Sequence, residues 1–135
     1  MRDPNEIIAL TRQGSARPDW QVFSRKRGSI GAFFRGTSHD PDPMLVVTPD
    51  GVVEYVDQKK PLIAVDFAEL ESIELQGSAT TTSDTAHASL HAWLDLHYSD
   101  GHQAKWEPSS FKDDLRILQA FIELFAFYKV WLLQR

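Results

Sequence analysis

Residues 90–98 contain two histidines, an aspartate and a tryptophan at alternate positions, and this segment is the candidate that we consider for a metal site. His91, Asp95 and His97 fall on one parity of a predicted strand, and both residue types are standard metal ligands. Because a strand rises about 3.3 Å per residue, only Asp95 and His97 are near neighbours on that face. We therefore interpret the three as surface residues of a polar strand and expect no metal or other cofactor.

Trp93 shares the outward parity of these residues. A large aromatic side chain is costly to leave in water, so Trp93 needs a covering group. We expect the N-terminal arm to cover it, through Trp20 or Phe23. The alternative is that Trp93 is an exposed anchor for a peptide or a second subunit.

Arg25, Lys26 and Arg27 form a basic triplet, and Arg35 follows further along the chain. Such a group of cations can neutralise a phosphate or an anionic lipid headgroup. Each cation adds only about 1 kcal/mol near an anionic surface, so the triplet would bind weakly. We favour a solvated basic turn and keep a weak anion-binding site as the alternative.

The residues that other catalytic chemistries require are absent or lie in the wrong context. No serine has the setting of a nucleophile elbow, no glycine-rich loop opens a helix, and HExxH does not occur. The absence of cysteine excludes disulfides, cysteine zinc sites and thiol nucleophiles. The formal net charge of -5 argues against general nucleic-acid binding, which depends on Lys and Arg. We therefore expect neither enzyme activity nor a nucleic-acid partner.

The length of 135 residues fits one domain with one core. The N-terminus lacks the apolar stretch of a secretory signal, and a chain without cysteine fits a reducing compartment, so we expect a cytoplasmic protein. The most apolar segment, residues 121–133, is too short to cross a bilayer and contains Glu123 and Lys129. We divide the chain into an N-terminal arm, residues 1–28, and a domain, residues 29–135.

Seven segments have the alternation or β-branched content of strands: residues 29–35, 44–48, 52–56, 62–67, 71–76, 90–98 and 102–107. We interpret residues 49–51 as a three-residue hairpin loop with Gly51 in the left-handed conformation, which places Leu45 opposite Tyr55. Residues 77–89 are small, polar and rich in threonine, and we expect a mobile loop there.

The last predicted hairpin has two possible registers. A two-residue turn would place Leu96 opposite Lys105. A three-residue loop over residues 99–101 instead places Leu94 opposite Trp106 and keeps one face apolar. We favour the second register for that reason.

After Pro108 the apolar residues change from strand spacing to helix spacing, with Ser109 or Ser110 as a suitable N-cap. We expect a helix over residues 110–134 that packs on the sheet through one stripe: Phe111, Leu115, Leu118, Ile122 and Phe125. A second apolar stripe follows it: Phe121, Leu124, Phe127, Tyr128, Val130 and Trp131. Such a helix is about 37 Å long, against about 17 to 23 Å for the strands. Its C-terminal half should therefore contact the N-terminal arm, a second subunit or a membrane surface.

The centre of the chain carries a hydrophobic pattern made of these residues: Pro61, Leu62, Ile63, Ala64, Val65, Asp66, Phe67, Leu70, Ser72, Ile73 and Leu75. This pattern is similar to the middle of bacterial PH-like and GRAM-type domains, and seven strands followed by one long helix resemble the pleckstrin-homology-like (PH-like) superfold. The resemblance covers most of the chain. It implies an α+β fold, a bent seven-stranded antiparallel barrel closed by the helix, that binds lipid headgroups, peptides or proteins without catalysis.

The expected function is a noncatalytic PH-like module that binds a protein partner or a second copy of itself. We assign this binding to four aromatic residues: Trp93, Phe127, Tyr128 and Trp131. One alternative is a peripheral binder of anionic membrane lipids that uses residues 25–27. The other is a small-ligand domain with a pocket between helix and sheet, lined by polar groups such as Tyr98, His102 or Asp66.

Overall fold

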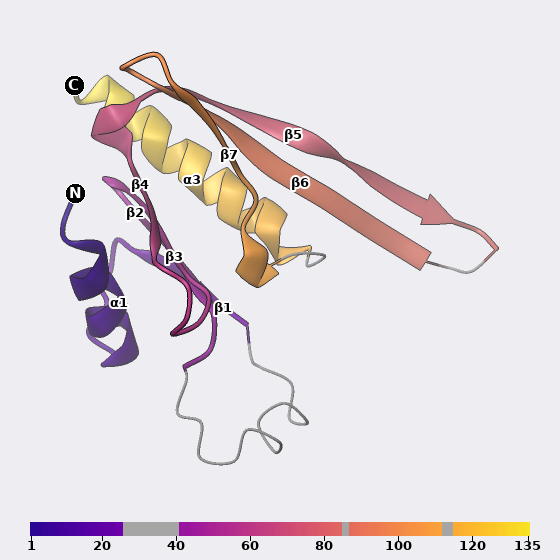
Figure 1. Cartoon of the computed structure of the whole chain (residues 1–135), viewed down its shortest axis with the longest axis horizontal. Coiled ribbons are helices and arrows are strands. Elements are labelled where there is room, and N and C mark those ends of the chain that lie inside the picture. The colour runs from indigo at the N-terminus through magenta and orange to yellow at the C-terminus, as the bar shows by residue number, and fades with distance from the viewer. Residues whose placement is uncertain (26–40, 85–86, 112–114) are drawn as a thin grey trace.

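The computed structural model describes residues 1–25, 41–84, 87–111 and 115–135, and it is an α+β fold with two antiparallel sheets and a C-terminal helix (Figure 1). The first sheet has the order β1 (Gln21–Ser24), β2 (Met44–Thr48), β3 (Gly51–Tyr55) and β4 (Ile63–Asp66). The second has the order β5 (Leu70–Thr82), β6 (His87–Tyr98) and β7 (Gln103–Trp106). The helices are α1 (Pro4–Arg12) and α3 (Arg116–Leu133), and short 3₁₀ turns cover Phe67–Glu69 and Ser109–Phe111.

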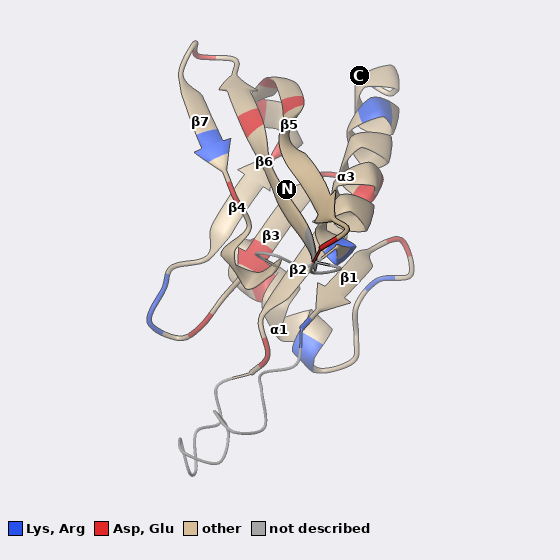
Figure 2. Ribbon diagram, turned by 90° about the vertical axis from the view of Figure 1, so that its right-hand side faces the viewer, with Lys and Arg blue, Asp and Glu red and all other residues tan. Residues whose placement is uncertain are grey.

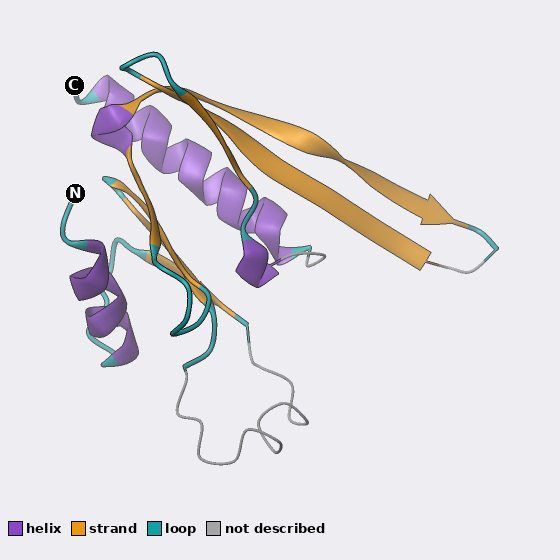
Figure 3. Cartoon of the chain, viewed as in Figure 1, coloured by secondary structure: helices purple, strands orange, loops and turns teal. Residues whose placement is uncertain are grey.

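Both faces of the first sheet are covered, and the two helices lie on opposite faces of it (Figure 3). The main core joins α3 to both sheets and includes Leu45, Phe67, Leu94, Phe121 and Leu124. A smaller core lies between α1 and the other face of the first sheet: Ile7, Ile8, Trp20, Met44, Val46, Val53 and Tyr55. Because β2 and β3 are buried on both faces, every residue of both strands is buried, and the apolar residues of β2 follow one another without alternation.

Helix α1 begins and ends at residues with the expected chemistry. The Asp3 side chain accepts a hydrogen bond from the Asn5 amide at 3.1 Å, and Pro4 occupies the first helical turn. Gly14, with a φ of 73°, follows the helix in the left-handed region. Both α1 and β1, which lie in the segment that we assigned to an N-terminal arm, are part of the packed fold.

The expected single seven-stranded sheet or barrel is not what the structure has. The described strands divide into one sheet of four and one of three, and no hydrogen-bonded ladder between described strands joins the sheets into a closed barrel. The strand expected over residues 29–35 lies outside the described residues. The α+β class, the antiparallel pairing and the C-terminal helix are confirmed.

The β2–β3 turn differs from our prediction by one residue, and the difference reverses the faces of β3. Thr48 pairs with Gly51, so the loop has two residues, and Leu45 lies opposite Glu54 where we had expected Tyr55. The Thr48 hydroxyl accepts hydrogen bonds from the Asp50 and Gly51 amides at 3.2 and 3.1 Å, which stabilises the tight turn. Gly51 does not have a positive φ.

Strands β5 and β6 form a long hairpin that extends well beyond the rest of the fold (Figure 1). We expected a mobile loop over residues 77–89, and that prediction is wrong, because β5 continues to Thr82 and β6 resumes at His87. The error arose because small and polar residues leave little hydrophobic signal, whereas the ladder here is held by main-chain hydrogen bonds. The β6–β7 register is confirmed, with Leu94 opposite Trp106.

The Glu54 carboxylate is fully buried, at 0% exposure, between the two sheets. Its Oε1 accepts a hydrogen bond from Trp106 Nε1 at 3.3 Å, and its Oε2 accepts from the Ser110 amide at 3.1 Å and the Ser110 hydroxyl at 2.6 Å. Ser110, one of the two serines that we considered as the N-cap of the last helix, donates to Glu54, and α3 begins at Arg116 without a side-chain cap. One carboxylate thus links β3, β7 and the turn that leads into α3.

We predict that Glu54→Ala lowers the free energy of unfolding by about 3 kcal/mol or more, because it leaves the buried donors of Trp106 and Ser110 unsatisfied. Chemical denaturation measures this loss. The matched control is Glu74→Ala on the exposed face of β5, which should change stability by no more than about 0.5 kcal/mol. Equal effects of the two substitutions would contradict the role of Glu54.

Gly77 allows the two strands of the long hairpin to approach each other. It has a φ of 149°, and a Cβ atom there would overlap the main chain of His91 and Ala92. A side chain is therefore excluded both by the backbone conformation and by the neighbouring strand.

Gly77→Ala should destabilise the hairpin by about 1–2 kcal/mol or more, since alanine there must strain the backbone or push β6 away. Thermal unfolding and amide exchange of β5 would detect the change. Ser78→Ala, at the next and exposed position, is the control and should leave both readouts as in the wild type.

Candidate interaction surface

The face of helix α3 that packs against the core differs from the one that we expected. Its buried residues are Ile117, Ala120, Phe121, Leu124 and Tyr128. Of the predicted first stripe only Phe111, which precedes the helix, is buried, and Phe125 is partly buried. The prediction failed because both stripes have helical spacing and similar apolarity, so periodicity alone does not decide which one is inside.

The remaining members of that stripe lie in water on the outer side of α3. Leu115 is 67% exposed, Leu118 36% and Ile122 66%. These three residues follow one another at spacings of three and four, so they form one continuous strip along the N-terminal half of the helix. Single exposed leucines are ordinary, but a row of three large aliphatic side chains on one helix face is a candidate interaction surface.

A groove lies where this strip meets the inner face of the long hairpin. Its volume is about 340 Å³, and its lining is mostly apolar: Leu75, Gln76, Gly77, Ser78, Ala79, Leu90, His91, Ala92 and Leu118. Leu75, on β5, is 44% exposed. We call this combined area the α3–hairpin surface, defined by Leu75, Ala79, Leu90, Leu115, Leu118 and Ile122.

The hairpin side of this surface carries no charge over a long stretch. Residues 75–83 contain neither an acidic nor a basic side chain, and the distal part of β5 is tan in Figure 2. On the other face of the hairpin, His91 Nδ1 lies 3.2 Å from Glu107 Oε1. The groove itself therefore suits an apolar or uncharged polar segment.

Comparison with known proteins does not identify a family for this fold. No model of a known protein family matches the chain, and no curated protein matches it.

The aromatic residues that we assigned to binding in the C-terminal half of α3 pack largely within the fold. Tyr128 is buried, donates to the Leu70 carbonyl at 3.4 Å and lies 5.2 Å from the Phe67 ring. Burial raises the pKa of its hydroxyl. Trp131 stacks on Tyr128 with ring centres 6.3 Å apart, and Phe127 is partly buried against the main core. Exposed aliphatic side chains remain in both halves of α3: Leu115, Leu118 and Ile122 in the first half, and Val130, Leu132 and Leu133 near the C-terminus.

Trp93 has neighbours other than those expected. Lys105 Nζ lies 4.3 Å from the centre of the Trp93 ring, and the His91 ring lies 5.1 Å away. The expectation that Trp20 or Phe23 covers it is wrong, because Trp20 packs with α1 and Phe23 packs in the main core. A cation–π contact of this kind partly shields Trp93 from water.

The histidines and the aspartate considered for metal binding do not come together in the structure. Within the described part of the chain, no group of three or more metal-ligating side chains gathers in one place. His97 Nε2 lies 3.8 Å from Glu74, whereas His91 pairs with Glu107. Arg25 donates to the Ser110 carbonyl at 3.5 Å. Lys26, Arg27 and Arg35 lie outside the described residues.

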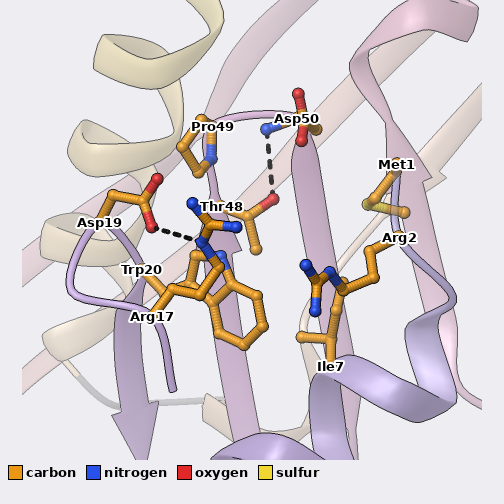
Figure 4. A pocket seen from close by; sticks show the side chains of 9 residues that line it. All are labelled: Met1, Arg2, Ile7, Arg17, Asp19, Trp20, Thr48, Pro49 and Asp50. Atoms are coloured by element: carbon orange, nitrogen blue, oxygen red, sulfur yellow. Dashed lines mark hydrogen bonds and ion pairs between the residues drawn. The ribbon is translucent and has the colours of Figure 1, made fainter. Parts of the chain in front are cut away.

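A second hollow, of about 350 Å³, lies beside the start of α1 and is lined by polar groups (Figure 4). Its charged residues are two arginines and two aspartates, so their formal charges cancel. Arg17 pairs with Asp19 at 3.4 Å, and Arg2 pairs with Glu6 at 3.3 Å. With its cations already paired, this hollow offers no excess charge to an anionic ligand.

The polar groups considered for a small-ligand pocket make separate contacts. The Tyr98 and His102 rings stack at 4.1 Å beside the β6–β7 turn, and burial raises the pKa of the Tyr98 hydroxyl. Asp66 accepts from the Met1 ammonium at 3.1 Å. Apolar side chains such as Phe121 and Leu124 fill the space between α3 and the sheets.

Two adjacent residues of α3 test which side of the helix is buried. We predict that Phe121→Ala costs about 3–5 kcal/mol of stability, because Phe121 is fully enclosed in the main core. Ile122→Ala should cost no more than about 0.5 kcal/mol, because its side chain faces water. Denaturant unfolding measures the loss of unfolding free energy in both variants. A larger loss for Ile122→Ala than for Phe121→Ala would show that the other stripe of α3 is the buried one.

Proposed function

We propose that this chain is a noncatalytic binding module of PH-like architecture that binds a protein segment at the α3–hairpin surface. The observation that carries the proposal is the exposed row of Leu115, Leu118 and Ile122 beside an open apolar groove. Covering this row would remove large aliphatic side chains from water, which favours association.

The order of the elements supports the PH-like part of the proposal. Four antiparallel strands are followed by three more and then by one C-terminal helix that packs on the sheets. This order agrees with the architecture that the resemblance implies, although the two sheets do not close into a barrel.

A protein segment suits this surface better than a membrane. Peripheral membrane binding usually combines an apolar face with cations that contact anionic headgroups. Residues 75–83 on the hairpin side contain no cation, and the surface is a groove between two elements. An extended strand or an amphipathic helix can fill such a groove.

The absence of catalysis is part of the same proposal. Among the described residues that line the groove, His91 is the only one with an ionisable side chain, and its Nδ1 lies 3.2 Å from Glu107 Oε1. A general acid or base needs a nucleophile or a reacting group within hydrogen-bond reach. Ser78 supplies the one hydroxyl among these lining residues, and the His91 ring is paired with Glu107 and not with the Ser78 hydroxyl.

Ile122→Glu and Leu118→Glu should weaken association at least tenfold, because they place a charge in the contact. Sedimentation velocity over a roughly hundredfold concentration range measures self-association, and capture with the tagged full chain measures binding of other proteins. Thermal unfolding should stay close to the wild type, because both side chains already face water.

The matched control is Val130→Glu, which changes another exposed aliphatic residue in the C-terminal half of the same helix. It should leave association unchanged. If all three variants associate as the wild type does, or if only Val130→Glu weakens association, the proposed site is wrong.

A further inference from the structure

Strand β5 has one edge that none of the described strands occupies. The second sheet has the order β5–β6–β7, so β5 pairs with β6 on one side only. It runs for 13 residues, whereas the other edge strands, β1, β4 and β7, have four residues each. An exposed edge of this length presents a row of main-chain donors and acceptors to any further strand.

This edge lacks most of the features that prevent strand addition. Proteins commonly protect edges with charged side chains, prolines, bulges or short strands. Here residues 75–83 contain no charge and no proline, and the irregularity in the pairing lies at the other end, between Leu70 and Ser72. The β7 edge, by contrast, is short and carries Lys105.

The same edge is self-complementary. Directly opposed residues of an antiparallel pair point to the same side of the sheet, so a two-fold axis through Ser78 places inner face beside inner face. In that register Leu75 faces Thr81, and Gly77 faces Ala79 of the other strand. The two Glu74 carboxylates lie eight positions apart along the ladder, about 26 Å, so acidic side chains do not oppose each other.

We propose that β5 pairs antiparallel with β5 of a second copy of this chain, about a two-fold axis at Ser78, to give one sheet that continues across both copies. The inference rests on the proposed function, since it names the partner at the α3–hairpin surface as a second copy. The added strand brings its inner-face side chains beside the groove at Leu118, where they cover the apolar row. A two-fold contact between identical edges closes on itself and stops at a dimer.

Single cysteines test the register directly, because the chain contains no cysteine of its own. Opposed residues of an antiparallel pair have Cα atoms about 4.5–5.5 Å apart, within the range of a disulfide. Ser78→Cys should therefore form a disulfide-linked dimer on mild oxidation. Ser89→Cys is the control on the neighbouring strand β6, where the two thiols would lie at least about 14 Å apart and should stay reduced.

Ser78→Lys tests the edge in the unmodified dimer. It places two ammonium groups opposite each other at the axis and should weaken self-association at least tenfold in sedimentation. The control Ser89→Lys makes the same change on the same hairpin, away from the edge, and should leave the dimer intact. Both positions are exposed, so both variants should unfold as the wild type does.

The possible results of these experiments distinguish a failure of the β5 self-pairing from a failure of the proposed function. A strict monomer, or a dimer that Ser78→Lys does not weaken, overturns the self-pairing. If such a protein still binds another protein through Leu118 and Ile122, the proposed function stands with a different partner. If Ser78→Lys weakens the dimer but Ile122→Glu and Leu118→Glu do not, the edge pairing stands and the α3–hairpin surface is wrong.

Discussion

The Glu54 carboxylate lies without solvent exposure where the two sheets and the entry to α3 meet. A buried carboxylate that lost its donors would cost several kcal/mol, so the indole of Trp106 and both groups of Ser110 must stay in place for the fold to persist. This condition fixes β7 and the turn after Pro108 relative to β3. Most other described members of the main core are apolar and can repack, apart from Tyr128, whose hydroxyl donates to the Leu70 carbonyl.

The position of the helix entry determines which side of α3 faces water. With Phe111 and Ile117 buried after the Ser110 turn, the helical repeat carries Phe121 and Leu124 inward and leaves Ile122 outward. The long hairpin then extends beyond the helix (Figure 1). The groove lies beside the exposed row, with Leu118 in its lining. The contact of Glu54 with Trp106 and Ser110 thus determines both the packing of α3 and the position of the proposed binding surface.

How much of this could be predicted depends on whether local pattern or long-range contact decides each element. The β6–β7 register followed from alternation and turn length, because Leu94 and Trp106 share a face only with the longer loop. The β2–β3 register did not, because both faces are buried and the Thr48 hydroxyl stabilises a shorter turn. The sequence could not show which of the two apolar rows of α3 is buried. That choice depends on the Glu54 contact, and a glutamate in a strand is normally interpreted as a surface residue.

Hydrogen exchange of the Trp106 indole and the Ser110 amide, followed by NMR, tests the anchoring contact most directly. Both protons are donated to a buried carboxylate. We predict that they exchange only when the whole domain unfolds, with an exchange free energy equal to the global free energy of unfolding. Exchange of either proton as fast as the amides of the exposed turn at Asp100 would show that the Glu54 contact does not hold the sheets and the helix together.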